Sequence, residues 1–187
     1  FNYIMSYSTQ NQLLLNKLME FYSKDNNIDK ILPIINGEHK VSLRLIDWFV
    51  TNYSKKYYTC YNISSNGNQR RFKVYVDYKL KLKAYSKKRF DPFCRWDRIT
   101  IPYSDNTSIQ TTLGQLNFFR WALEYRILDF IEKNVIDIEN DMNKRNSSSK
   151  NRSGKSTAKT RKKRKELSVS ATKSIKKEEV EIIVKFN

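Results

Sequence analysis

The sequence predicts an α+β fold in which a small antiparallel β-meander is packed by two to three amphipathic helices. A disordered basic arm and a C-terminal edge strand are expected to follow. Apolar residues recur at helical spacing in segments 9–23, 42–56 and 112–133. Between the last two segments, apolar and polar residues alternate, which is typical of β-strands. Of the 25 aromatic residues, 24 precede position 144, so the hydrophobic core is expected there.

Charge divides the chain further. Residues 1–143 carry a net charge of +6, whereas the shorter segment 144–187 carries +11. Together with the periodicity, this predicts an N-terminal helix (1–30), an α+β core domain (31–143), a disordered polybasic arm (144–177) and a C-terminal strand (178–187).

The first two predicted helices are separated by turns. The helix 9–23 is followed by polar residues at 24–27, and a second turn is expected at 33–37, where Pro and Asn-Gly occur together. Ser42 is a suitable N-cap for the next helix, which is expected to extend to residue 56.

The predicted meander has three strands, the first two joined at Asn66-Gly67, a pair that favours a tight hairpin turn. Its long middle strand alternates strictly between apolar and polar residues. A helix that begins near Tyr78 is the alternative for the second half of this strand, because Tyr78, Leu82 and Tyr85 also fit a helical period. The expected strands are 57–63, 69–83 and 95–103.

The third predicted helix, 112–133, begins with a capping-box pattern at Thr112 and Gln115. Near the C-terminus, EEVEIIVKFN alternates again and is expected to dock as an edge strand. The basic arm would then be held at both ends.

The arm is the strongest functional signal. Residues 144–165 contain eleven Lys and Arg and no acidic residue, and they have too little apolar surface to form a core. Such a polycation favours a nucleic acid, DNA or RNA, as partner. A nuclear-import signal at 159–165 is an alternative or additional role, and no membrane partner is expected. The predicted contacts in the arm are Lys159, Arg161, Lys162, Lys163, Arg164 and Lys165.

A second basic region lies in the predicted meander. Residues 55–98 contain 13 basic and three acidic residues. Cations interleaved with aromatic side chains suit contact with phosphates and stacking on bases. The alternative is a solvated strand face that uses Lys to prevent aggregation. The predicted contacts are Arg71, Lys73, Tyr75, Lys79, Lys81, Lys83, Tyr85, Lys87, Lys88 and Arg89.

No catalytic residue, metal or cofactor is predicted. The chain has one histidine, His39, and its two cysteines, Cys60 and Cys94, lack a metal-binding spacing. The alternative is a metal-dependent nuclease, because Asp77 and Lys79 would form a D-x-K pair on one strand face. Such a site needs another carboxylate, for which the candidates are Asp47, Asp91 and Asp97.

Three segments carry a resemblance: SLRLIDWFVTNYSKK, YKLKLKAYSKKRFDPFCR and TTLGQLNFFRWALE. Over residues 33–133 the chain resembles a family of small uncharacterised proteins of giant, nucleocytoplasmic large DNA viruses. The resemblance implies a location in the host cytoplasm, the virus factory or the virion. It supplies no catalytic residues.

Taken together, the sequence predicts a non-enzymatic, weakly sequence-selective nucleic-acid-binding protein that serves viral genome packaging or organisation. The alternative is a structural or minor virion protein whose basic arm binds acidic surfaces of other virion proteins. A role in the nucleus follows only from the basic run 159–165.

Overall fold

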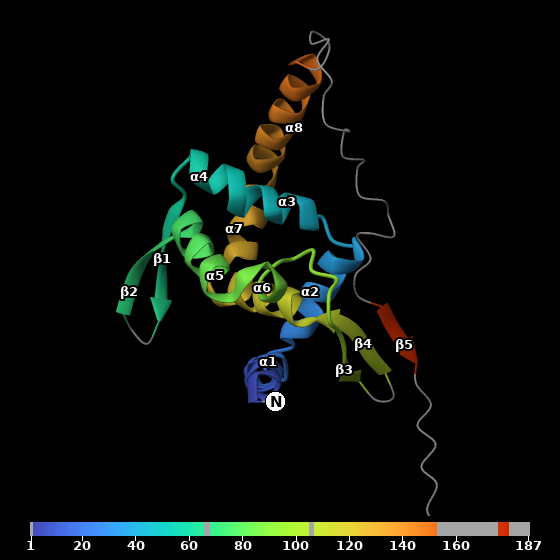
Figure 1. Cartoon of the computed structure of the whole chain (residues 1–187). Helices are drawn as coiled ribbons and strands as arrows, with labels where there is room; N and C mark the ends of the chain where they lie inside the picture. Colours follow the sequence, from blue (N-terminus) through green and yellow to red (C-terminus); the bar gives the residue numbers. More distant parts are fainter. Residues whose placement is uncertain (1, 66–67, 105–106, 153–175, 180–187) are drawn as a thin grey trace, which may run out of the picture.

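A computed structural model of the chain describes residues 2–65, 68–104, 107–152 and 176–179. Side chains are described from residue 10 to residue 145, except around the turns at 65–68 and 104–107. The α+β class is confirmed (Figure 1). The elements are α1 (Asn2–Tyr22), α2 (Asn27–Asn36), α3 (Leu43–Trp48), η1 (Phe49–Tyr53), α4 (Ser54–Lys56), β1 (Cys60–Ser65), β2 (Asn68–Lys73), α5 (Val74–Arg89), β3 (Arg98–Ser104), β4 (Thr107–Thr112), α6 (Leu113–Glu124), α7 (Ile127–Lys133), α8 (Val135–Arg152) and β5 (Lys176–Glu179).

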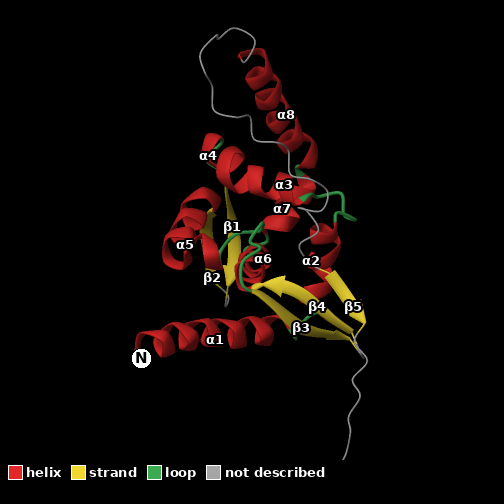
Figure 2. Cartoon of the chain, turned by 45° about the vertical axis from the view of Figure 1, so that its right-hand side comes forward, coloured by secondary structure: helices red, strands yellow, loops and turns green. Residues whose placement is uncertain are grey.

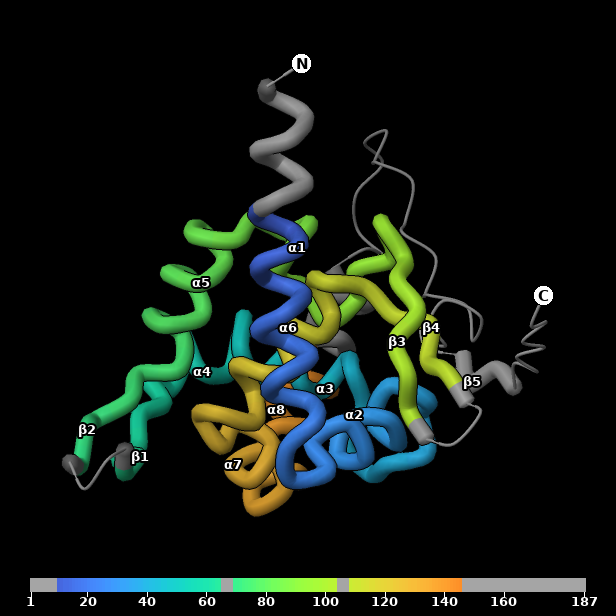
Figure 3. The backbone as a smooth tube through the Cα atoms, turned by 90° about the horizontal axis from the view of Figure 1, so that it is seen from below, coloured from blue at the N-terminus to red at the C-terminus, as the bar shows by residue number. Residues whose placement is uncertain are grey.

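The first predicted helix is confirmed as α1, which begins earlier than expected. Its Leu18 is fully buried, and the hydroxyl of Tyr22 donates a hydrogen bond of 2.7 Å to the carbonyl of Leu116 in α6. Figure 3 shows α1 lying over α6. The N-terminal helix therefore packs directly on the core.

The turn predicted at 33–37 is wrong for 33–36, because these residues, including Pro33, lie inside α2, and the chain turns only at Gly37. The helix continues through the proline since the neighbouring Ile31, Ile34 and Ile35 are buried, which compensates for the missing N–H donor. Gly37 ends the helix at a φ of +77°, a conformation that glycine adopts without a Cβ clash.

The predicted helix 42–56 is confirmed as the continuous series α3, η1 and α4, in which η1 is a π-helical turn. The hydroxyl of Ser42 accepts a hydrogen bond of 3.2 Å from the N–H of Leu45, as expected of an N-cap.

The hairpin β1–β2 is antiparallel, as predicted, but its second strand is much shorter than expected. The strand prediction for 74–83 is wrong, because these residues belong to α5. After Val76 the chain has no β-branched residue until the helix ends, and Lys, Leu and Ala favour a helix. The sequence alternates, but the alternating residues are spread around a helix.

The prediction of one three-stranded meander is also wrong, since the strands form two separate sheets. β3 pairs with β4, which the sequence did not predict, and β5 pairs with β4 at the sheet edge. Figure 2 shows this sheet and the β1–β2 hairpin on opposite sides of α6. An edge strand is present as predicted, but of the predicted range 178–187 it includes only residues 178 and 179, and it begins at Lys176 within the predicted arm; residues 180–187 lie outside the described residues.

The predicted helix 112–133 is confirmed as α6 and α7, which are separated at Arg126, where φ is +53°. The hydroxyl of Thr112 accepts a hydrogen bond of 3.2 Å from the N–H of Gln115, so the predicted cap is present. Helix α8 extends to Arg152, so the disorder predicted from residue 144 is wrong for 144–152. The rest of the arm, up to residue 175, lies outside the described residues.

An aromatic cluster around Trp121 joins α6 to α5 and to Phe90, the residue that follows α5. Trp121 is 2% exposed, and its ring centroid lies 5.4 Å from that of Phe90 and 5.6 Å from that of Phe118. Its indole N–H donates a hydrogen bond of 2.7 Å to the carboxylate of Asp77 in α5. This bond fixes which side of α5 faces the core.

Asp141 anchors α8 to the end of the 42–56 helix. The indole N–H of Trp48 and the hydroxyl of Tyr57 each donate to its carboxylate at 3.1 Å, and the Lys56 ammonium pairs with it. Burial raises the pKa of Asp141, but the hydrogen bonds from Lys56, Trp48 and Tyr57 together hold that pKa below its ordinary value.

We expect Asp77→Ala to lower the free energy of unfolding by about 1–3 kcal/mol, because the buried indole N–H of Trp121 loses its acceptor. Asp77→Asn keeps a side-chain oxygen and should lose less. Urea denaturation followed by circular dichroism measures both variants. Equal losses in the two would contradict the assigned role of the hydrogen bond.

The lowered pKa of Asp141 predicts a pH dependence of stability. The carboxylate contributes stability above the pKa of an unfolded aspartate, near 4, and this contribution disappears as the pH falls through the lower, folded-state pKa. Between pH 7 and pH 3 the wild-type protein should therefore lose more unfolding free energy than Asp141→Asn. Denaturation at each pH tests this, and an identical loss in the variant would contradict it.

Candidate functional site

Two adjoining cavities, of about 500 Å³ and about 560 Å³, lie at the base of the β1–β2 hairpin and along the first turns of α5. They share Tyr75 and Val76, and we call them together the basic groove. Five cationic side chains line it, and no aspartate or glutamate is among its described lining residues. The five cations are Lys55, Arg71, Lys73, Lys79 and Lys83.

The change from strand to helix at Lys73 and Val74 positions the groove. Val74 is fully buried, and its N–H donates a hydrogen bond of 3.2 Å to the carbonyl of Thr59 in the turn before β1. This bond holds the start of α5 against the end of α4. Side chains from α4, β1, β2 and α5 consequently surround one cavity.

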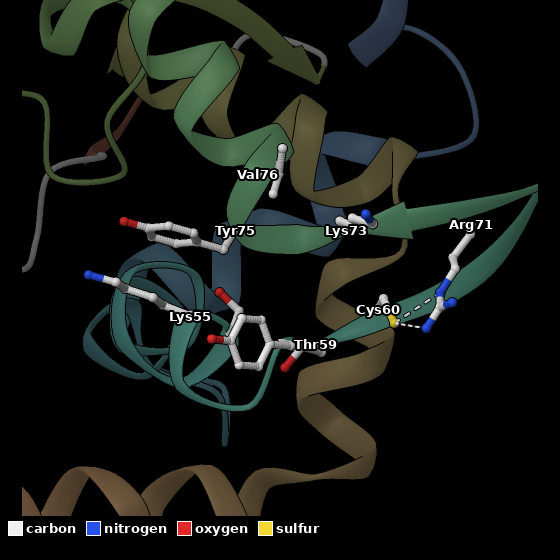
Figure 4. Close-up of a pocket in the computed structure, with 9 residues that line it drawn as sticks. Lys55, Thr59, Cys60, Arg71, Lys73, Tyr75 and Val76 are labelled. Atoms are coloured by element: carbon white, nitrogen blue, oxygen red, sulfur yellow. Dashed lines mark hydrogen bonds between the residues drawn. The ribbon is translucent and has the colours of Figure 1, made fainter.

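The two ends of the hairpin-base cavity differ in structure (Figure 4). At one end, Lys55 and Tyr75 lie side by side, with the Lys55 ammonium 5.7 Å from the centroid of the tyrosine ring. At the other end, the guanidinium of Arg71 donates to the thiol of Cys60 over distances of 3.0 and 3.2 Å. Lys73 projects from the strand between these ends. The cavity is thus cationic along its length.

Tyr58 lines the same cavity and is 87% exposed. It follows the C-terminal end of α4 with a φ of +47°, in the left-handed region that usually suits glycine. The N–H of Thr59 donates back to the carbonyl of Ser54 at 3.1 Å, which closes the end of the helix around Tyr58. The backbone therefore presents this ring to solvent in an uncommon conformation.

The second cavity lies on the outer face of α5. Lys79 and Lys83 are exposed there beside Val76 and Leu80, which are 51% and 60% exposed. These four residues lie on one face because they are three or four positions apart. This face of α5 therefore presents both apolar and cationic side chains to solvent.

The structure separates the other residues predicted for this region. Lys81 and Tyr85 turn toward the core: the Lys81 ammonium lies 6.0 Å from the Tyr125 ring centroid, and Tyr85 stacks on Phe90 at 6.2 Å. The expectation that they share one face with Lys79 and Lys83 is wrong, because it holds for a strand and these residues form a helix.

The predicted residues Lys87, Lys88 and Arg89 follow a kink at Ser86, where φ is +61°. Lys87 and Lys88 are exposed and Arg89 is half-buried, and none of the three lines the basic groove. The predicted arm contacts lie outside the described residues, namely Lys159, Arg161, Lys162, Lys163, Arg164 and Lys165.

The strand geometry proposed for Asp77 and Lys79 is wrong, because both belong to α5 and two positions along a helix point in nearly opposite directions. Asp77 faces Trp121, whereas Lys79 is exposed. Of the carboxylates considered as partners for such a site, Asp47 has a raised pKa because of its burial and the neighbouring Asp91. Within the described residues, no three His, Cys, Asp or Glu side chains come together as a metal site.

Lys55, Tyr58 and Cys60 belong to the groove but were not predicted as site residues. The sequence carries one signal for them, the run of cations and tyrosines immediately before the first strand.

None of the described helices is both long and apolar enough to cross a membrane.

Comparison with known proteins identifies the family. The chain matches the family of unknown function DUF7197 over residues 4–187 and belongs to it. It is 44% identical over 135 residues to Uncharacterized protein L507 of Acanthamoeba polyphaga mimivirus. That match covers 69% of this chain and 52% of the relative, so the chain spans about half the relative's length. The resemblance to proteins of giant DNA viruses is thus confirmed. No solved structure matches the chain.

Proposed function

We propose that this member of the DUF7197 family is a non-enzymatic, weakly sequence-selective nucleic-acid-binding protein. The observation that carries the proposal is the basic groove, where five cations and two tyrosines line adjoining cavities without a described carboxylate. Phosphates are the natural ligands of such a surface, and exposed lysines contact them without reading sequence.

Weak selectivity follows from the kinds of side chain in the groove. Base recognition in DNA depends largely on bidentate contacts from Arg, Asn or Gln. The described lining residues include no Asn or Gln, and the guanidinium of Arg71 already donates to Cys60. The lysines would therefore bind phosphates of any sequence.

The basic segment 144–165 would supply further phosphate contacts, since it contains eleven cations and no acidic residue. A protein that binds nucleic acid in this way suits packaging or organisation of a viral genome, in the host cytoplasm, the virus factory or the virion. Import into the nucleus through residues 159–165 is compatible with this role.

The exposed Val76 and Leu80 favour a second candidate, a structural or minor virion protein that binds another virion protein. In that case the basic segment would contact acidic protein surfaces. Deletion of 144–165 separates the two candidates. A nucleic-acid-binding protein would lose much of its affinity for nucleic acid, whereas a structural protein would lose assembly with its protein partner.

Binding should depend steeply on salt. If about six phosphates are contacted, the logarithm of the affinity for duplex DNA should fall with the logarithm of salt concentration with a slope of about −5. Fluorescence anisotropy with labelled DNA and RNA oligonucleotides measures this slope. An absence of binding to DNA and RNA at low salt would reject the proposal.

The triple variant Lys73/Lys79/Lys83→Gln should bind about tenfold or more weakly, and its salt slope should shrink by about 3, one for each lost phosphate contact. The control is Lys17/Lys40/Lys133→Gln, which removes the same charge from exposed lysines outside the groove. If both triple variants weaken binding equally, net charge rather than the groove determines affinity.

A further inference from the structure

Tyr58 combines an exposed aromatic ring with an uncommon backbone conformation. Its ring is 87% exposed at a cavity, and its backbone is in the left-handed region at a φ of +47°. A bulky residue in this region is an uncommon and strained choice where glycine would fit. Strain of this kind is concentrated at functional sites.

The ring of Tyr58 is largely uncovered, since the residue is 87% exposed. Among the described side chains, none stacks on this ring, places a cation over it or hydrogen-bonds to its hydroxyl. The other aromatic side chain of the cavity, Tyr75, is different, because the Lys55 ammonium lies over its ring at 5.7 Å. Tyr58 is therefore the aromatic surface that a ligand can stack upon.

The cavity beside Tyr58 has a volume of about 500 Å³, within the range of small-ligand sites. Lys55, Arg71 and Lys73 line it, so a ligand that carries both an aromatic ring and a negative charge complements it. A nucleotide has both. In a duplex the base faces are covered by neighbouring base pairs, whereas a single strand can turn an unpaired base onto a protein side chain.

We propose that the hairpin-base cavity binds an unpaired nucleotide of a single-stranded nucleic acid, with its base stacked on Tyr58 and its phosphate contacting Lys55 and Lys73. This inference rests on the proposed nucleic-acid-binding function and assigns its preferred form. The protein prefers single strands to duplexes, and Tyr58 provides the preference.

The decisive variant is Tyr58→Gly in the full chain. Glycine removes the ring and also relieves the backbone strain, so the variant should unfold at the same temperature as the wild type or a higher one. Its affinity for a labelled oligothymidylate should fall about tenfold or more, while its affinity for a duplex of equal length should change little. Loss of binding with retained stability distinguishes stacking from a folding defect.

Two further variants serve as controls. Tyr58→Phe keeps the ring and should keep the single-strand affinity. Asn26→Gly makes the same change to glycine at another exposed left-handed position, φ +50°, outside the groove, and should leave binding unchanged. A loss in Tyr58→Phe as large as in Tyr58→Gly would overturn the stacking assignment.

The remaining outcomes separate this inference from the proposed function. Equal wild-type affinity for single strands and duplexes, unaffected by Tyr58→Gly, overturns the inference but leaves nucleic-acid binding intact. Absence of binding to both overturns the two proposals together. Thymidine monophosphate is included as a competitor: if it displaces the oligonucleotide at micromolar concentration, the cavity is a free-nucleotide site, which also overturns the inference.

Discussion

The hydrogen bond from the indole of Trp121 to the carboxylate of Asp77 determines how α5 lies on the protein. The apolar residues of α5 do not by themselves define one buried face of the helix. Val74 and Tyr78 are buried, whereas Val76 and Leu80 are exposed. The buried indole needs an acceptor, and Asp77 in the first turn of α5 provides it. With Asp77 facing the aromatic cluster, Lys79 and Lys83 lie on the opposite side of the helix and are exposed to solvent.

The same orientation explains why a cationic groove can exist beside the hydrophobic core. Once Val74 is buried and its N–H bonded to the carbonyl of Thr59, the first turn of α5 lies against the end of α4. Lys55 of α4 and Arg71 and Lys73 of β2 then line one cavity, where their mutual repulsion is not relieved by any carboxylate among its described lining residues. Such an arrangement costs stability in the free protein and favours binding of an anion.

Local interactions were predictable from the sequence, and those that depend on distant residues were not. The caps at Ser42 and Thr112 join residues three positions apart, and the pairing of β1 with β2 joins residues at most 13 positions apart, so pattern alone identified them. Segment 78–85 fits both a strand and a helical period, and the contact of Asp77 with Trp121, 44 positions further along, adds to the helical propensity of the segment in favour of the helix. The basic character of the region was predicted, whereas the inclusion of Lys55 and Tyr58 required the folded turn at Thr59.

The short helix α4 connects the groove to the basic C-terminal segment. Lys55 lines the groove, while the adjacent Lys56 pairs with Asp141 and thereby anchors α8. Helix α8 carries the first residues of the segment 144–165, so both basic regions are attached to one turn of helix. Two weak contacts on one chain bind a long ligand more tightly than either does alone, provided that both can be made at once. A polyanion has the length to reach both regions, which a small anion lacks. Under the proposed function, the anchor at Asp141 would thus favour a polymeric ligand over a free nucleotide.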